Sequence, residues 1–398
     1  MKPWARSICT ALCAAAFLSG CASQPAARIA PAQQLFHDQL FQPPATPIDV
    51  RQVFAASPAM RDYVRHEIGT ATPGKDVRRM LFDALYRRDK LQLEYDAAVT
   101  RNAAETFEAR AGNCLSLAIM TAALARELNM PVLFQQIDVE EVWSRAGNLY
   151  FAANHVNLAL GRPRSEHNPY AIYSVDDARS LTVDFIPVPP KAREAAKPLD
   201  ERTVLAMYLN NRAAELLSTG HIDDAYWAAR KAAEADPLFL NAYNTLGVIY
   251  QHRGSLEAAE QALRYAHAQA PDNTIYLSNL AQTLENQNKL DEAAALRVRL
   301  AQLEPYPPFH FFHLGQEAMK LGDYARARKL FERELERVPD YHEVYFWLAV
   351  ANYQLGNLRA ADNYMARAMQ NSTTRSAHDL YSAKLDRIRA YEAQQRNK

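Results

Sequence analysis

The strongest constraint on the fold is a 34-residue period in the C-terminal half of the chain. Prolines, two sets of small residues and one set of turn residues all recur at this step. They are Pro237, Pro271, Pro305 and Pro339; Ala225, Ala259, Ala293, Ala327 and Ala361; Ala213, Gly247, Ala281, Gly315 and Ala349; and Gly220, Gly254, Asn288, Gly322 and Gly356. Small residues let two helices approach closely, Gly or Asn allows a positive φ in a turn, and Pro ends a helix. The period therefore predicts a stack of helical hairpins.

A helical hairpin of this length, with small residues at two places and proline at its end, resembles the tetratricopeptide repeat. We predict five repeats, at 206–239, 240–273, 274–307, 308–341 and 342–375, and a capping helix and tail over 376–398. The resemblance implies a concave groove that binds a protein or peptide. His310 and His313 lie three residues apart on a predicted helix, but no further ligands accompany them. We therefore predict no metal site and no cofactor.

The first 20 residues have the pattern of an export signal. Lys2 and Arg6 flank the start of an apolar stretch that is too short to span a bilayer, and small residues precede a potential cleavage site. Residues 18–21 read Leu-Ser-Gly-Cys and resemble the lipobox of bacterial lipoproteins. The resemblance implies a signal peptide over 1–20 and lipid on Cys21. Because Ala22 is not Asp, it also implies anchoring in the outer membrane, facing the periplasm. An ordinary secretory signal is the alternative.

The segment 21–47 contains five prolines among Ala and Gln, a composition that predicts a semi-extended tether behind the lipidated residue. The whole chain has 45 basic and 45 acidic residues. If Lys2 and Arg6 leave with the signal, 43 basic residues remain against 45 acidic ones. This balance gives no support to a nucleic-acid partner.

Residues 48–190 have a different pattern, which predicts an α+β domain joined to the repeats by a linker over 191–205. Apolar residues at helical spacing predict helices at 77–86 and 100–109, and a nearly continuous apolar run predicts a buried helix from Cys114 to Asn129, capped by Asn113. Alternating patterns then predict strands at 132–139, 149–160, 170–175 and 181–186. We therefore expect helices packed on an antiparallel sheet.

Cys114 is the focus of the candidate chemistry. The other three cysteines, Cys9, Cys13 and Cys21, lie in or at the edge of the signal, so Cys114 is the one free thiol expected in the mature chain. It opens the buried helix, where the helix dipole and a nearby imidazolium would both favour the thiolate. Backbone N–H groups at Cys114 and near Gly112 could bind an oxyanion.

A histidine and an acid on the predicted strands could complete a catalytic site. If the sheet packs on the buried helix, His155 would carry the proton and Asp184 would orient the imidazole ring. Asp176 and Asp177 are alternatives for the acid, because a long segment separates His155 from Asp184. Asn113 is a candidate side-chain donor to an oxyanion, although its capping role competes with this use.

Residues 95–187 resemble the bacterial transglutaminase-like superfamily, which belongs to the papain-like cysteine folds. The matching motifs are YDAAVTRNAAETF at 95–107, RAGNC at 110–114, ARELNMP at 125–131, Asn154-His155 and Val183-Asp184. The resemblance implies that Cys114 is the nucleophile, His155 the base and Asp184 the orienting acid. Its individual motifs are short, but their order and spacing agree.

Two functions compete at this point. The expected one is a lipid-anchored envelope enzyme that transfers acyl groups from peptide or side-chain amides, as a protease, an amidase or a crosslinking transglutaminase. Its repeats would bind the substrate or a partner protein. The alternative is an inactive envelope scaffold, in which the papain-like domain and the repeats only mediate protein–protein interaction.

Overall fold

The computed structural model describes residues 33–68, 76–87, 90–97, 99–146, 149–161, 180–186, 192–193, 195–306, 308–339, 341–372 and 374–396. The predicted signal with Cys21, the predicted strand at 170–175, and Asp176 and Asp177 lie outside the described residues. Within the described residues, no helix has both the length and the apolar character that crossing a membrane requires.

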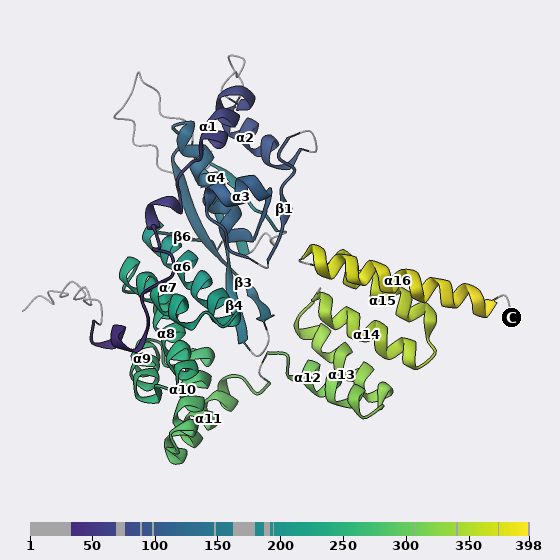
Figure 1. Cartoon of the computed structure of the whole chain (residues 1–398). Coiled ribbons are helices and arrows are strands. Elements are labelled where there is room, and N and C mark those ends of the chain that lie inside the picture. Colours follow the sequence, from purple (N-terminus) through teal and green to yellow (C-terminus); the bar gives the residue numbers. More distant parts are fainter. Residues whose placement is uncertain are drawn as a thin grey trace, which may run out of the picture.

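The N-terminal region combines short helices with a small sheet (Figure 1). Its helices are α1 (Pro58–Tyr63), continued by a π turn (Val64–Ile68), α2 (Val77–Tyr86), α3 (Ala103–Ala109) and α4 (Cys114–Glu127). An antiparallel sheet has the strand order β5-β4-β3-β6, with β3 at Val132–Ala146, β4 at Leu149–Leu160, β5 at Leu181–Val183 and β6 at Lys197–Leu199. A second, parallel pair joins β1 (Glu94–Tyr95) to β2 (Ala111–Gly112).

Helix α4 lies at the centre of this region and packs against β3 and β4. Its residues from Cys114 to Ala125 are all buried, as their almost purely apolar sequence predicts. It begins where predicted, because Oδ1 of Asn113 accepts a hydrogen bond from the backbone N–H of Ser116 at 2.9 Å. It ends at Glu127, slightly before the predicted end, and Asn129 follows in a left-handed conformation with φ of 53°.

The C-terminal half is a series of paired helices, which confirms the predicted helical hairpins. The pairs are α6 (Glu201–Ser218) with α7 (Ile222–Ala235), α8 (Leu240–Arg253) with α9 (Leu256–Gln269), α10 (Thr274–Asn286) with α11 (Leu290–Leu303), α12 (His310–Lys320) with α13 (Tyr324–Arg337), and α14 (His342–Gln354) with α15 (Leu358–Gln370). Helix α16 (Arg375–Arg396) packs on α15. Helix α6 starts ahead of the predicted 206, because the side chain of Asp200 caps it.

The periodic residues act as the sequence predicts. The turns between paired helices contain the periodic Gly and Asn residues, with φ between 60° and 83°. The small residues inside the helices allow close packing: a Cβ added to Gly247 would lie 2.4 Å from Cγ of Leu263, and one added to Gly315 would lie 2.5 Å from Phe331. A larger residue at either position would push the two helices of the pair apart.

The segment 33–47 packs on the first repeats, which corrects the prediction of a tether. Leu35 and Phe41 are buried, and the ring of Phe41 stacks on that of Tyr226 with 4.0 Å between centroids. The hydroxyl of Tyr226 donates to Asp38 at 2.5 Å, and that of Tyr250 donates to the main-chain oxygen of Leu35 at 2.7 Å. Proline content predicted an extended chain, but the burial of these apolar side chains fixes its position.

The predicted linker at 191–205 is also partly structured. It contains strand β6, which pairs with β3, and the first turn of α6. One continuous cluster of buried apolar residues extends from Leu35 through α4 and the sheet to Tyr276 in α10. The N-terminal region and the first repeats therefore share a hydrophobic core.

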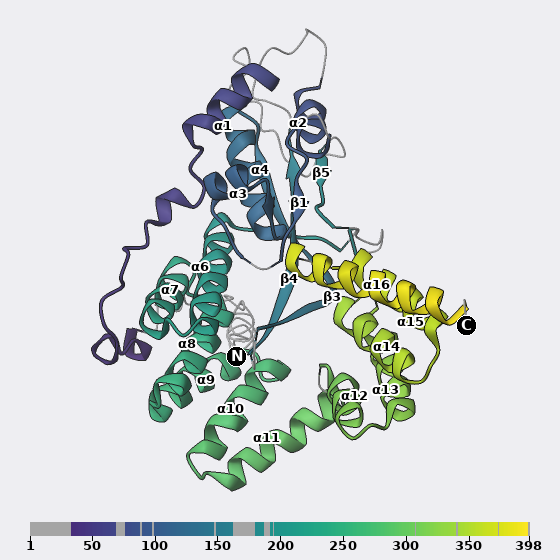
Figure 2. The same ribbon diagram turned by 45° about the vertical axis from the view of Figure 1, so that its right-hand side comes forward.

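The stack of repeats is interrupted between α11 and α12. In α11 only Ala293 is buried, and the side chains of Leu290 and Val298 are more than half exposed. Separate buried clusters hold α12 to α14 and α14 to α16 together. This last block lies opposite the first repeats, and the start of α16 reaches the N-terminal region, where Arg375 donates to Glu94 at 3.1 Å (Figure 2).

The close packing at Gly247 generates a prediction about stability. We expect Gly247→Ala to destabilise the chain by about 1–3 kcal/mol, because the new methyl group overlaps the side chain of Leu263. Urea unfolding followed by circular dichroism measures the change. His252→Ala on the exposed face of the same helix is the control, with an expected change within about 0.5 kcal/mol. Equal stabilities for the two variants would contradict the packing argument.

Candidate active site

Cys114 lies at the first position of α4, and it is a buried, free thiol with 9% of its surface exposed. The strand pair β1–β2 leads directly into this point. Tyr95 pairs with Gly112, and the backbone N–H of Asp96 donates to the oxygen of Gly112 at 3.0 Å. The chain therefore enters α4 through a hydrogen-bonded strand, which fixes the position of the cysteine.

The sheet brings His155 and Asp184 together next to this helix end. His155 lies on β4, and β5 pairs directly with β4, so that Val183 lies opposite Leu158. Asp184 follows β5, and its Oδ1 lies 3.5 Å from Nε2 of His155. Both side chains are buried, with 0% of His155 and 8% of Asp184 exposed. The long segment between the two residues does not keep them apart.

Asp184 is held by further contacts that the sequence analysis missed. Nδ2 of Asn157 donates to Oδ1 at 2.5 Å, Nε of Arg193 lies 3.0 Å from Oδ2, and the hydroxyl of Tyr86 donates to the main-chain oxygen at 2.6 Å. Asn157 could have been found, because it lies two residues after His155 and so on the same face of a strand. Arg193 and Tyr86 carry no such signal in the sequence.

These contacts determine the charge on the acid. Burial raises the pKa of Asp184, but the contact with His155, the hydrogen bond from Asn157 and the charge of Arg193 outweigh it, so the pKa lies below its usual value. Asp184 is therefore an anion at neutral pH. It can orient the imidazole ring and stabilise its protonated form.

His155 lies 3.5 Å from Asp184, between Nε2 and Oδ1, and Cys114 is close enough to affect its charge, although the buried ring nitrogens form no hydrogen bond with the described residues. Burial lowers the pKa of His155, but the contacts with Asp184 and Cys114 outweigh burial and raise the pKa to about 9. The ring is therefore protonated at neutral pH. A protonated imidazole at this place can give its proton to a leaving group.

Asn113 and Gly112, the two candidates for binding an oxyanion, differ in the contacts that they make. Three hydrogen bonds occupy the side chain of Asn113: Oδ1 accepts from the N–H and the hydroxyl of Ser116, and one hydrogen of Nδ2 is donated to Oγ1 of Thr100, all at 2.9 Å. These contacts hold the amide group against the cap. Gly112 is needed for space, since an added Cβ would lie 2.8 Å from Cβ of Ser116. The backbone N–H groups at the start of α4 remain the candidate donors.

Tyr95 is a further neighbour of the cysteine that sequence reasoning did not single out for this role. Its hydroxyl interacts with the backbone of Cys114. Burial and the nearby Cys114 both raise the pKa of Tyr95, so its phenol stays protonated at neutral pH. Within the described residues, no group of three or more His, Cys, Asp or Glu side chains could hold a metal ion.

The comparisons with known proteins identify the repeats. The tetratricopeptide repeat family model matches residues 210–274 and 312–371. The chain carries tetratricopeptide repeats. Among its relatives, the TPR repeat-containing protein PA4667 of Pseudomonas aeruginosa is 31% identical over 38% of this chain and 26% of its own length. The type IV pilus assembly protein PilF of the same organism is 29% identical over 30% of this chain and 48% of its own length.

The chain thus spans about a quarter to a half of the length of these relatives. Two solved structures of repeat proteins are also similar to it. That of PilF from Pseudomonas aeruginosa covers 50% of this chain and 100% of its own, with 22% identity and a TM-score of 0.27. That of TTC0263, a TPR protein of Thermus thermophilus, covers 45% of this chain and 98% of its own, with 17% identity and a TM-score of 0.29.

The raised pKa of His155 predicts a pH dependence. Because the folded value of about 9 lies above the ordinary value of 6.5, the contribution of the charged ring to stability is complete below pH 6.5 and is lost as the pH rises through about 9. We expect the ring of His155 to remain an imidazolium at pH 8, and Asp184→Asn to lower its pKa. Nitrogen NMR of labelled histidine measures both. Titration of His155 near 6.5 in both proteins would rule out the proposed contacts.

Proposed function

We propose that this chain binds a protein or peptide along its tetratricopeptide repeats and acts on it with Cys114 in a papain-like, transglutaminase-like α+β domain. The family match of the repeats supports the binding part of the proposal. One observation carries the catalytic part: Oδ1 of Asp184, after β5, lies 3.5 Å from Nε2 of His155 on β4, and the free thiol of Cys114, at the start of α4, is close enough to affect the charge of that histidine.

The arrangement suits acyl transfer from an amide. The sulfur of Cys114 would attack the carbonyl carbon, forming a C–S bond, while backbone N–H groups at the start of α4 hold the oxyanion. The protonated His155 would give its proton to the leaving nitrogen as the C–N bond breaks, leaving a thioester. His155 could then accept a proton from water, which yields an acid, or from an amine, which yields a crosslink. Asp184 would orient the ring throughout.

The second candidate is an inactive scaffold, in which both parts of the chain only mediate protein–protein interaction. The family model, which matches the repeats, supports this more directly than catalysis. The closure of the site supports it too, since Cys114 is 9% and His155 only 1% exposed, and the side chain of Asn113 is occupied by Ser116 and Thr100. The binding function belongs to both candidates, and the reactivity of Cys114 separates them.

The activated thiol can be tested in the folded chain. We expect Cys114 to react with iodoacetamide at pH 6 faster than glutathione does, because the neighbouring imidazolium favours the thiolate. His155→Ala should remove the excess rate. Mass spectrometry of the peptide that contains Cys114 measures the alkylation, and circular dichroism verifies the fold of both proteins. Equal rates for the wild type and His155→Ala would contradict catalysis and favour the scaffold.

We further propose that the chain is a lipoprotein of the bacterial outer membrane, anchored through Cys21 and facing the periplasm. The order of charged residues, apolar stretch and Leu-Ser-Gly-Cys at 18–21 supports this.

Metabolic labelling with an alkyne fatty acid tests the anchor. We expect label on the full chain and none on Cys21→Ala, because acyl transfer needs that thiol. Cys13→Ala, which removes a cysteine inside the predicted signal, should label as the wild type does. A fully unlabelled wild-type chain would instead support the ordinary secretory signal.

A further inference from the structure

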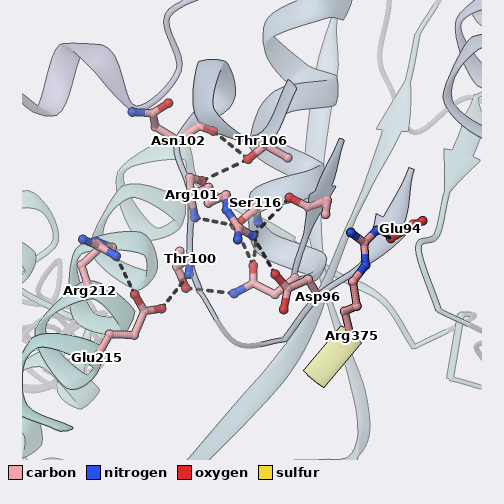
Figure 3. A network of polar contacts seen from close by, with 12 residues as sticks. Glu94, Asp96, Thr100, Arg101, Asn102, Thr106, Ser116, Arg212, Glu215 and Arg375 are labelled. Carbon is pink, nitrogen blue, oxygen red and sulfur yellow. Dashed lines mark hydrogen bonds and ion pairs between the residues drawn. The ribbon is translucent and has the colours of Figure 1, made fainter. Parts of the chain in front are cut away.

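A line of hydrogen bonds joins the first repeat helix to the start of the Cys114 helix (Figure 3). Oε1 of Glu215, on α6, accepts from the backbone N–H of Thr100 at 2.7 Å. Oγ1 of Thr100 accepts from Nδ2 of Asn113 at 2.9 Å. Oδ1 of Asn113 in turn accepts from Ser116 and so caps α4. Each link is a direct contact, and the line spans 115 residues of sequence in its first step.

The residues of this line are largely buried. Thr100 is 1% exposed and Ser116 is fully buried, while the side chain of Glu215 is 25% exposed. A second contact ties the same segment to the cap, because the backbone N–H of Arg101 donates to the hydroxyl of Ser116 at 2.9 Å. A displacement of residues 100 and 101 would therefore move both groups that hold the first turn of α4.

An ionisable side chain such as that of Glu215 is uncommon between two packed parts of a chain. Burial raises the pKa of Glu215 above its ordinary value, even though the N–H of Thr100 and the charge of Arg212 act against this. Nη1 of Arg212 donates to Oε2 at 2.7 Å, which leaves Oε1 for Thr100. The two contacts together hold the carboxyl group of Glu215 against the backbone of Thr100.

We propose that Glu215 is a positioning residue for Cys114, which links the first tetratricopeptide repeat to the reactivity of the thiol. Glu215 holds Thr100, Thr100 holds Asn113, and Asn113 caps the first turn of α4 by accepting from the N–H of Ser116. Cys114 is the first residue of that turn. This inference rests on the proposed function, because it concerns the activated state of that thiol.

The chain offers a matched control for a purely structural role. Glu201, at the other end of the packed face of α6, forms an ion pair with Arg126 near the C-terminal end of α4. The pair joins the same two helices as the Glu215 line but lies far along α4 from Cys114. If Cys114 depends only on the packing of α6 against α4, variants of Glu201 and of Glu215 should both change its reactivity. If it depends on positioning, only variants of Glu215 should.

The test measures alkylation of Cys114 by iodoacetamide from pH 5 to 9 in the full mature chain. We expect Glu215→Ala to slow the reaction at pH 6 by roughly 3- to 10-fold, the range for a residue that acts through its neighbours. Glu215→Gln should restore most of the rate, because its side-chain oxygen can still accept from Thr100. Glu201→Ala should react as the wild type does.

Thr100→Val provides an independent measurement if Glu215→Ala does not fold. It keeps the shape of the side chain and the backbone N–H but removes the acceptor for Asn113, so the same slowing is expected. Wild-type rates in Glu215→Ala or Thr100→Val, alongside a slow His155→Ala, would overturn the positioning role and leave the proposed function intact. An equal slowing by Glu201→Ala would also overturn it. Insensitivity of Cys114 to His155→Ala would instead remove the proposed function itself.

Discussion

The capping of α4 by Asn113 is the interaction on which the candidate site depends. A buried apolar helix must satisfy the N–H groups of its first turn, and Asn113 does so through Ser116. Because Asn113 is the cap, Cys114 is the first residue of the helix. One turn later, the thiol would lie inside the hydrophobic core, away from the free N–H groups. The cap therefore fixes both the position of the sulfur and the direction of the helix dipole that acts on it.

The shared core has consequences for how the repeats and the site can work together. Because buried residues run without interruption from α4 and the sheet into α10, the first repeats cannot swing freely relative to Cys114. The break in packing lies further along, between α11 and α12, where Leu290 and Val298 are exposed. A ligand bound by the first repeats would thus lie at a defined distance from the thiol. The last block is attached to the N-terminal region by the exposed Arg375–Glu94 pair.

The sequence predicted the features that depend on local pattern. Gly254 and Asn288 occur where the turns need positive φ, and Gly247 lies where two helices touch. Cys114 could be placed at a helix start because the capping pattern is local. The distance from His155 to Asp184 could not be predicted, since it depends on how β5 pairs with β4.

Features made by contacts between distant segments were missed for the same reason. The proline content of 21–47 indicates an extended chain, and nothing in that stretch reveals that Phe41 would find the ring of Tyr226. Glu215 has the appearance of a solvated residue on a helix surface, and its contact with Thr100 appears only when α6 packs on the N-terminal region. Such pairings depend on tertiary structure, which single-sequence patterns encode weakly.

The burial of His155 with Asp184 bears on the choice between catalysis and a scaffold. Desolvating two ionisable groups is costly, and apolar residues of similar size at such sites are often neutral or stabilising. The 3.5 Å contact between Nε2 and Oδ1 is too long to recover that cost fully by a hydrogen bond. The pair therefore carries a cost in stability. The acyl transfer proposed above would give it a use, since a buried acid can keep an imidazole charged and oriented.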